Sequence, residues 1–156
     1  MTHLRSFVWG LFLVLAAASC GSSGTSPSTV PTATGVASAQ ESTSAPTIVL
    51  SEWKVTVPST LKAGTVTFTI TNSGTIQHEL LVFKSGLAPA AYPTDKAGNI
   101  VEDAPGITLL SDGENIDPGA SQTRTVNLSK PGKYLFVCNI PGHFRSGMFS
   151  VVTVTP

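Results

Sequence analysis

Hydrophobic and polar residues alternate along most of the chain after residue 46. The clearest run is TVTFTIT at 65–71, which places Val66, Phe68 and Ile70 on one side and four threonines on the other. Because successive side chains of a β-strand point to opposite faces, this pattern predicts a half-buried strand. Three further runs are equally rich in β-forming residues, at 121–128, 133–138 and 148–154.

Two other runs are expected to be strands with irregular features. The run 76–83 places Ile76, His78, Leu80 and Val82 on one face, so it brings a histidine to the apolar side. The run 48–57 is an expected first strand, in which the alternation slips near Leu50 at a bend or bulge. The expected core aromatic residues are Trp53, Phe68, Phe83, Phe136 and Phe149.

Turn signals separate these runs, and no stretch shows a helical period. The tripeptides NSG, KPG and IPG and the tetrapeptide DPGA mark the turns. An all-β, two-sheet antiparallel sandwich of about seven strands over residues 47–156 is the simplest arrangement of such elements. The segment 84–115 is too long for a plain turn, so we expect it to wrap one edge of the sandwich, with a short helical turn and a strand near 106–110.

The N-terminal residues read as a targeting signal followed by a linker. Arg5 precedes an apolar stretch of twelve residues from Phe7 to Ala18, which is short for a bilayer span and suits a signal peptide over 1–19. The stretch ends in AASC, which resembles a bacterial lipobox, so Cys20 is the expected lipid-bearing residue. Residues 20–46 are rich in Ser, Thr, Ala and Pro with one charge, a composition typical of a disordered tether.

Composition limits the classes of partner. Charged residues make up 12% of the chain and the formal net charge is zero, so no basic surface for nucleic acid is expected. If the signal is removed and Cys20 carries lipid, Cys138 is the remaining free thiol. The remaining histidines are His78 and His143, and the remaining methionine is Met148.

The stretch CNIPGHFRSGM, residues 138–148, contains the candidate chemistry. It spaces Cys138, His143 and Met148 five residues apart between two predicted strands, where a loop can gather three side chains around one point. Two imidazoles, with His78 as the second, plus a thiolate and a weak thioether form the ligand set of a blue copper centre. Four protein ligands leave little room for a substrate, so we expect no enzyme.

These residues carry a resemblance to a known family. The segments TNSGTIQHELLVF and YLFVCNIPGHFRSGM, with the DPGAS turn between them, are similar to those of cupredoxins of the plastocyanin and azurin type, with sulfocyanin-like loop spacing. The resemblance implies a Greek-key sandwich and one mononuclear type 1 copper. It also implies that His78, Cys138 and His143 are the strong ligands and Met148 the weak axial one. Glu79 stands where the family often has Asn.

The expected function is single-electron transfer outside the cytoplasm by a monomer tethered to a membrane through its lipid. The family uses the exposed edge of its loop histidine as the electron exit, so Pro141 and Phe144 beside His143 are the expected docking residues for a redox protein partner.

Several alternatives remain at this point. One is a copper carrier or scavenger that delivers metal to a partner, and another is a metal-free structural cupredoxin. A zinc site would use Cys138, His78 and His143 but would leave Met148 without a role. A cysteine nucleophile paired with His143 lacks a recognisable orienting acid.

Overall fold

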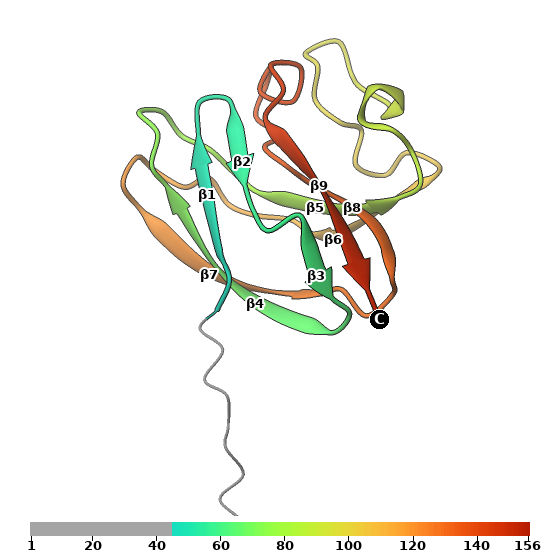
Figure 1. Ribbon diagram of the computed structural model, residues 1–156. Helices are drawn as coiled ribbons and strands as arrows, with labels where there is room; N and C mark the ends of the chain where they lie inside the picture. The colour runs from blue at the N-terminus through green and yellow to red at the C-terminus, as the bar shows by residue number, and fades with distance from the viewer. Residues whose placement is uncertain (1–44) are drawn as a thin grey trace, which may run out of the picture. The chain divides into compact units, whose positions relative to one another are not determined.

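The structure, a computed structural model, describes residues 45–156 as a sandwich of two β-sheets (Figure 1). The four-stranded sheet has the order β2 (Lys54–Thr56), β1 (Thr47–Ser51), β4 (Thr65–Asn72) and β7 (Ser121–Asn127). The five-stranded sheet has the order β3 (Thr60–Lys62), β9 (Phe149–Thr155), β8 (Gly132–Val137), β5 (Leu81–Ser85) and β6 (Ile107–Ser111). The predicted all-β sandwich is therefore confirmed.

Strand number and direction differ from the prediction. The described residues form nine strands in mixed sheets, because β1 pairs with β4 and β3 pairs with β9 in parallel. The expected single strand over 48–57 is the hairpin of β1 and β2. Ile48, Leu50 and Val55 all point into the core, and a turn at Glu52 and Trp53 resets the alternation between them. The slip near Leu50 therefore marks the approach to a turn.

The main core lies between the two sheets. In β4 the predicted alternation holds, since Phe68 and Ile70 are fully buried and the threonines face outward or lie at partly covered positions. Phe68 meets Phe136 of β8 edge to face, with ring centroids 5.8 Å apart. Cys138 and Met148 belong to the same buried cluster, so the metal-ligand candidates continue the core at one end of the sandwich.

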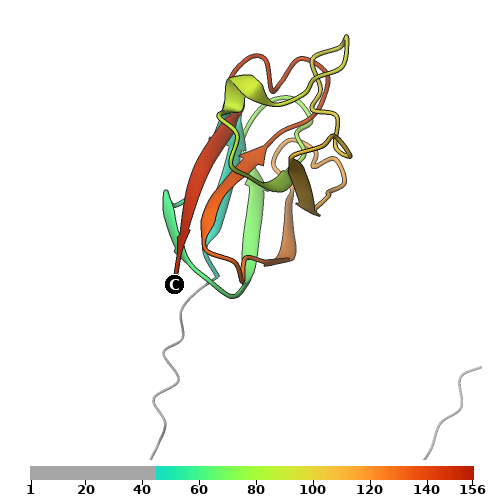
Figure 2. The same cartoon turned by 90° about the vertical axis from the view of Figure 1, so that its right-hand side faces the viewer.

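A second cluster covers the outer face of the five-stranded sheet. Residues 81–83 of β5 are all buried, which requires cover on both faces of this strand. The cover comes from the segment after β5, which contains the 3-10 helix η1 (Pro89–Ala91), Tyr92 and Ile100. This segment is yellow-green in Figures 1 and 2 and approaches the β8–β9 loop, whose Phe144 joins the cluster. The predicted helical turn and the strand β6 are both confirmed.

Two predictions are wrong, one about the burial of Trp53 and one about the start of the strand expected over 76–83. Trp53 is not a core residue, because the tip of the β1–β2 hairpin leaves it 46% exposed. The strand expected over 76–83 begins only at Leu81, and Ile76 is 41% exposed. His78 precedes the strand and forms an isolated bridge with Ile116 instead. Phe149 is partly buried against the second cluster.

The signal peptide over 1–19, the lipidation of Cys20 and nearly all of the tether over 20–46 lie outside the described residues, which begin at Ala45. Between residues 45 and 156, no helix has the length and apolar character needed to cross a membrane.

Candidate metal centre

Two polypeptide segments bring the candidate ligands to one end of the sandwich. Cys138 directly follows β8, Met148 directly precedes β9, and His143 lies in the loop between them. His78 arrives from the segment before β5. Its backbone exchanges two hydrogen bonds with Ile116, at 3.2 and 2.6 Å. All four side chains are buried, with exposures between 0 and 6%.

The β8–β9 loop is closed by its own backbone. The N–H of His143 donates to the Ile140 carbonyl at 2.9 Å, and the N–H of Met148 donates to the His143 carbonyl at 3.1 Å. The N–H of Cys138 donates to the Met148 carbonyl at 3.1 Å, which fixes the two ends of the loop against each other. Gly147 turns the chain before Met148 with φ of 90°. The five-residue spacing therefore folds into a compact loop that directs its side chains inward.

Three donor atoms face one another across a small triangle. Nδ1 of His78 lies 3.3 Å from Nδ1 of His143, and the Sγ of Cys138 lies 3.9 and 3.2 Å from these two nitrogens. The centre of the circle through three points with these separations is about 2.0 Å from each atom. Metal–imidazole bonds of about 2.0–2.1 Å and metal–thiolate bonds of about 2.3 Å match this spacing. The three residues thus fit one mononuclear metal ion.

Met148 completes the set with a thioether. It is fully buried in the same cluster as Cys138. Its backbone accepts a hydrogen bond from the Cys138 N–H and donates one to the His143 carbonyl. A soft thiolate and thioether suit Cu(I), whereas imidazoles suit Cu(II). The donor chemistry therefore favours copper over zinc and gives Met148 a role.

Burial sets the charge of the donors. Desolvation lowers the pKa of His78 and of His143, so both imidazoles are neutral and have a free lone pair. Desolvation also raises the pKa of Cys138 to about 11, although the Glu79 N–H donates to its sulfur at 3.4 Å. The thiol is therefore protonated at neutral pH, and metal binding must release its proton.

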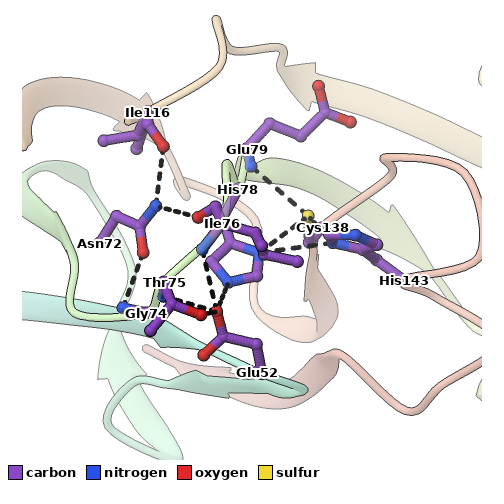
Figure 3. A network of polar contacts seen from close by, with 10 residues as sticks. All are labelled: Glu52, Asn72, Gly74, Thr75, Ile76, His78, Glu79, Ile116, Cys138 and His143. Atoms are coloured by element: carbon purple, nitrogen blue, oxygen red, sulfur yellow. Dashed lines mark hydrogen bonds and ion pairs between the residues drawn. The ribbon is translucent and has the colours of Figure 1, made fainter. Parts of the chain in front are cut away.

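Two residues that hold the loop before His78, Asn72 and Glu52, were not identified from the sequence (Figure 3). The fully buried Asn72 donates through Nδ2 to the carbonyls of Ile76 and Ile116, each at 2.8 Å, and its Oδ1 accepts from the Gly74 N–H. Oε1 of Glu52 accepts from the N–H groups of Thr75 and Ile76 at 2.6 and 3.1 Å. The turn signal NSG marks this loop, but nothing in the sequence indicates its partner in the β1–β2 hairpin.

These backbone donors keep Glu52 ionised. The N–H of Thr75 is the largest cause that lowers the pKa of Glu52 to about 2, so the side chain is an anion at neutral pH. Its Oε1 lies 3.7 Å from Nε2 of His78, the nitrogen that points away from the donor triangle.

The surroundings of His143 differ from the prediction. Phe144 is only 7% exposed and packs against Tyr92 and Phe149, so the expectation of an exposed Phe144 is wrong. It is drawn inward because the segment after β5 provides an apolar surface for it. The exposed aromatic residue beside His143 is instead Trp53, whose ring centroid lies 4.9 Å from that of His143 in an edge-to-face contact. Pro141 is exposed as expected.

Glu79 and Asn139 are the polar neighbours of Cys138: the Glu79 N–H donates to its sulfur, and Asn139 follows it in the chain. Burial raises the pKa of the half-buried Glu79 to about 7, with Asp112 and Glu102 adding to the effect. Asn139 is buried, and its side chain both accepts from the Ile100 N–H and donates to the Ile100 carbonyl. The second cluster is thereby fixed to the residue next to Cys138.

A two-sheet β-sandwich that gathers two histidines, a cysteine and a methionine at one end defines a cupredoxin. The comparisons with known proteins narrow this class. The sulfocyanin (SoxE) domain matches residues 29–156, and the chain therefore belongs to the sulfocyanin family. The match begins before the expected domain boundary at residue 47.

Individual relatives are similar over different lengths. The crystal structure of dithionite-reduced auracyanin from Roseiflexus castenholzii is 29% identical, with a TM-score of 0.55, over 70% of this chain and 95% of that one. Auracyanin-B of Chloroflexus aurantiacus and the copper-resistant cuproprotein CopI of Pseudomonas aeruginosa are each 42% identical over 41 residues, or 26% of this chain. This stretch spans 17% of the first protein and 23% of the second.

Proposed function

We propose that the protein is a type 1 copper protein that carries single electrons. The observation that carries the proposal is the buried triangle of two imidazole nitrogens and one cysteine sulfur, next to Met148. Copper supplies the one-electron chemistry when it is bound. The residues of the chain hold a fixed donor set that both oxidation states accept, so little rearrangement accompanies electron gain or loss.

The rival function is that of a copper carrier or scavenger that delivers metal to a partner. One relative, CopI, is named a copper-resistant cuproprotein, which makes a role in copper handling the alternative to test. Two measurements on the copper-loaded protein separate these functions. An electron carrier should show fast, reversible one-electron voltammetry and should keep its copper in the reduced state when a Cu(I) chelator is added. Slow voltammetry combined with rapid loss of Cu(I) to the chelator would instead establish a delivery protein.

The proposed route for electrons passes through Trp53. The His143 ring is only 6% exposed, whereas Trp53 is 46% exposed and contacts it edge to face. Trp53 and the exposed Pro141 therefore offer apolar surface next to the site, on which a small redox protein can dock. Redox encounters use small interfaces, so a patch of this size is sufficient.

Replacing the exposed indole tests this route. Trp53→Ala should leave the visible copper spectrum nearly unchanged and slow electron exchange with a redox partner at least several-fold. Leu87→Ala is the matched control, because Leu87 is also exposed but follows the end of β5 that is remote from His78. Equal rates in wild type and Trp53→Ala would place the electron exit elsewhere.

The proposed location is outside the cytoplasm, with the protein held on a membrane by lipid on Cys20. The support is the AASC sequence after an apolar stretch, followed by residues 21–46, whose composition is rich in Ser, Thr, Ala and Pro. The strand β1 begins at the end of the sandwich opposite the β8–β9 loop (Figure 1). Cys20→Ala should release the protein from the membrane fraction. Wild-type protein that is soluble and unmodified at Cys20 would refute the anchor.

A further inference from the structure

Nε2 of His78 is the ring nitrogen that points away from the donor triangle. Nε2 of this fully buried ring has no hydrogen-bond partner among residues 45–156, and a buried polar nitrogen without a partner is costly. The charged group that approaches it is Glu52, with Oε1 at 3.7 Å (Figure 3). That distance is too long for a hydrogen bond, but a movement of about 0.7 Å would bring the two atoms to the usual separation of about 3.0 Å.

We propose that Glu52 is a positioning residue that accepts the Nε2 proton of His78 as a hydrogen-bond partner and so directs Nδ1 at the metal. The proposal rests on the proposed copper function for its metal and adds a residue from the β1–β2 hairpin to the site. Carboxylates that receive the second N–H of a ligating histidine fix the tautomer and the orientation of its ring.

The carboxylate of Glu52 is held in place by hydrogen bonds from the loop before His78. Oε1 accepts from the N–H of Thr75 at 2.6 Å, from the N–H of Ile76 at 3.1 Å and from the hydroxyl of Thr75 at 3.2 Å. The hairpin residue and the histidine-bearing loop are therefore joined through one anion, whose Oε1 lies 3.7 Å from Nε2 at the edge of the His78 ring.

Gly74 provides independent support. A Cβ at this position would lie 2.7 Å from Oε1 and 2.8 Å from Oε2 of Glu52, closer than real Cβ atoms approach other groups. Gly74 has no positive φ, so its backbone conformation is open to other residues. The space that its missing side chain leaves is the space that the carboxylate occupies.

The first test uses the full chain without metal. Nitrogen-15 NMR of the imidazoles should show a single His78 tautomer, with the proton on Nε2 and none on Nδ1. Glu52→Ala should give a mixture of tautomers and weaken Cu(II) binding at least tenfold. Gly74→Ala should have the same effects although it keeps the carboxylate, whereas Gly86→Ala, which meets no atom within 4 Å, should have neither.

The second test uses the reduction potential and the conservative variant Glu52→Gln. The amide still accepts hydrogen bonds, so the fold and the tautomer should be retained, but the negative charge next to the ligand is lost. Because that charge stabilises Cu(II) more than Cu(I), its removal should raise the potential. Glu114→Gln, which removes an exposed carboxylate on another loop, should leave the potential unchanged.

The outcomes separate this proposal from the copper function itself. A protein that binds copper normally but has the same reduction potential in wild type and Glu52→Gln, and the same His78 tautomer in wild type and Glu52→Ala, would overturn the role of Glu52 alone. Failure of the wild-type protein to bind copper would overturn the proposed function first. If Glu52→Ala does not fold, the Gly74→Ala and Glu52→Gln results decide.

Discussion

At the scale of single residues, the ligands depend on polar side chains that the alternation pattern does not reveal. Asn72 is the last residue of β4 and is fully buried. Its amide joins the loop before His78 to Ile116, the residue whose backbone pairs with His78 itself. One side chain therefore holds the strand end, the loop and the histidine in a fixed relation.

Removal of this amide should destabilise the metal-free protein. Asn72→Ala removes three hydrogen bonds, two from Nδ2 to the carbonyls of Ile76 and Ile116 and one from the Gly74 N–H to Oδ1. Each lost hydrogen bond costs about 0.5–1.5 kcal/mol. We expect a loss of at least about 2 kcal/mol in the free energy of unfolding, measured by urea denaturation. Asn127→Ala is the control, because Asn127 is exposed and accepts only a local hydrogen bond from Ser129. Equal stability of the two variants would show that the Asn72 bonds are dispensable.

At the scale of elements, the β8–β9 connection determines where three of the ligands lie. Its ends are joined by the bond from Cys138 N–H to the Met148 carbonyl, and its tip is folded by the bond from His143 N–H to the Ile140 carbonyl. Phe144 anchors one side of the loop in the second cluster. The segment 84–115 thus supports the metal loop from outside the sandwich.

The turn at Gly147 requires a backbone conformation that favours glycine. Its φ of 90° is unfavourable for a residue with a Cβ, at a cost of about 1–2 kcal/mol. Because no atom lies within 4 Å of an added Cβ, Gly147→Ala should lose stability by about this amount from backbone strain alone. Thermal unfolding measures the loss. Gly86→Ala has the same open space without the positive φ and should be close to neutral; a loss of equal size there would exclude backbone strain as the cause.

At the scale of the whole molecule, the sequence predicts the sandwich and the ligand set but not their surroundings. Alternation in 65–71 predicted β4 because that strand has one face in the core and one in solvent. The alternation in residues 76–83 predicted a strand from residue 76, but β5 begins only at Leu81. His78 is buried because it lies in a loop that pairs with Ile116, not because it lies on a strand face. The pairing of Trp53 with His143, and of Glu52 with His78, joins residues distant in sequence, and no local pattern records such contacts.

One contribution to the acid–base behaviour of the metal-free domain comes from Glu79, the half-buried carboxyl beside Cys138. Burial raises the pKa of Glu79 from its ordinary 4.5 to about 7. At Glu79 the folded state therefore binds more protons than the unfolded state over this interval, so the contribution of Glu79 to the free energy of unfolding should fall as pH rises from about 4.5 to about 7. His78 and His143, whose pKa values are lowered by burial, contribute the opposite slope. Glu79→Gln should reduce this fall, as measured by urea denaturation at several pH values. Glu114→Gln should leave the wild-type profile intact, and a Glu79→Gln profile as steep as wild type would exclude Glu79 as the source.

The central claim is that one thiolate and two imidazoles hold a single copper ion, and the visible spectrum tests it most directly. One equivalent of Cu(II) added to the metal-free protein should produce an intense blue or green colour, because the Cys138 sulfur transfers charge to copper. The colour should saturate at one equivalent, and Cys138→Ser should abolish it while the protein remains folded. A colourless wild-type protein at saturation, or an intensely coloured Cys138→Ser variant, would contradict the account.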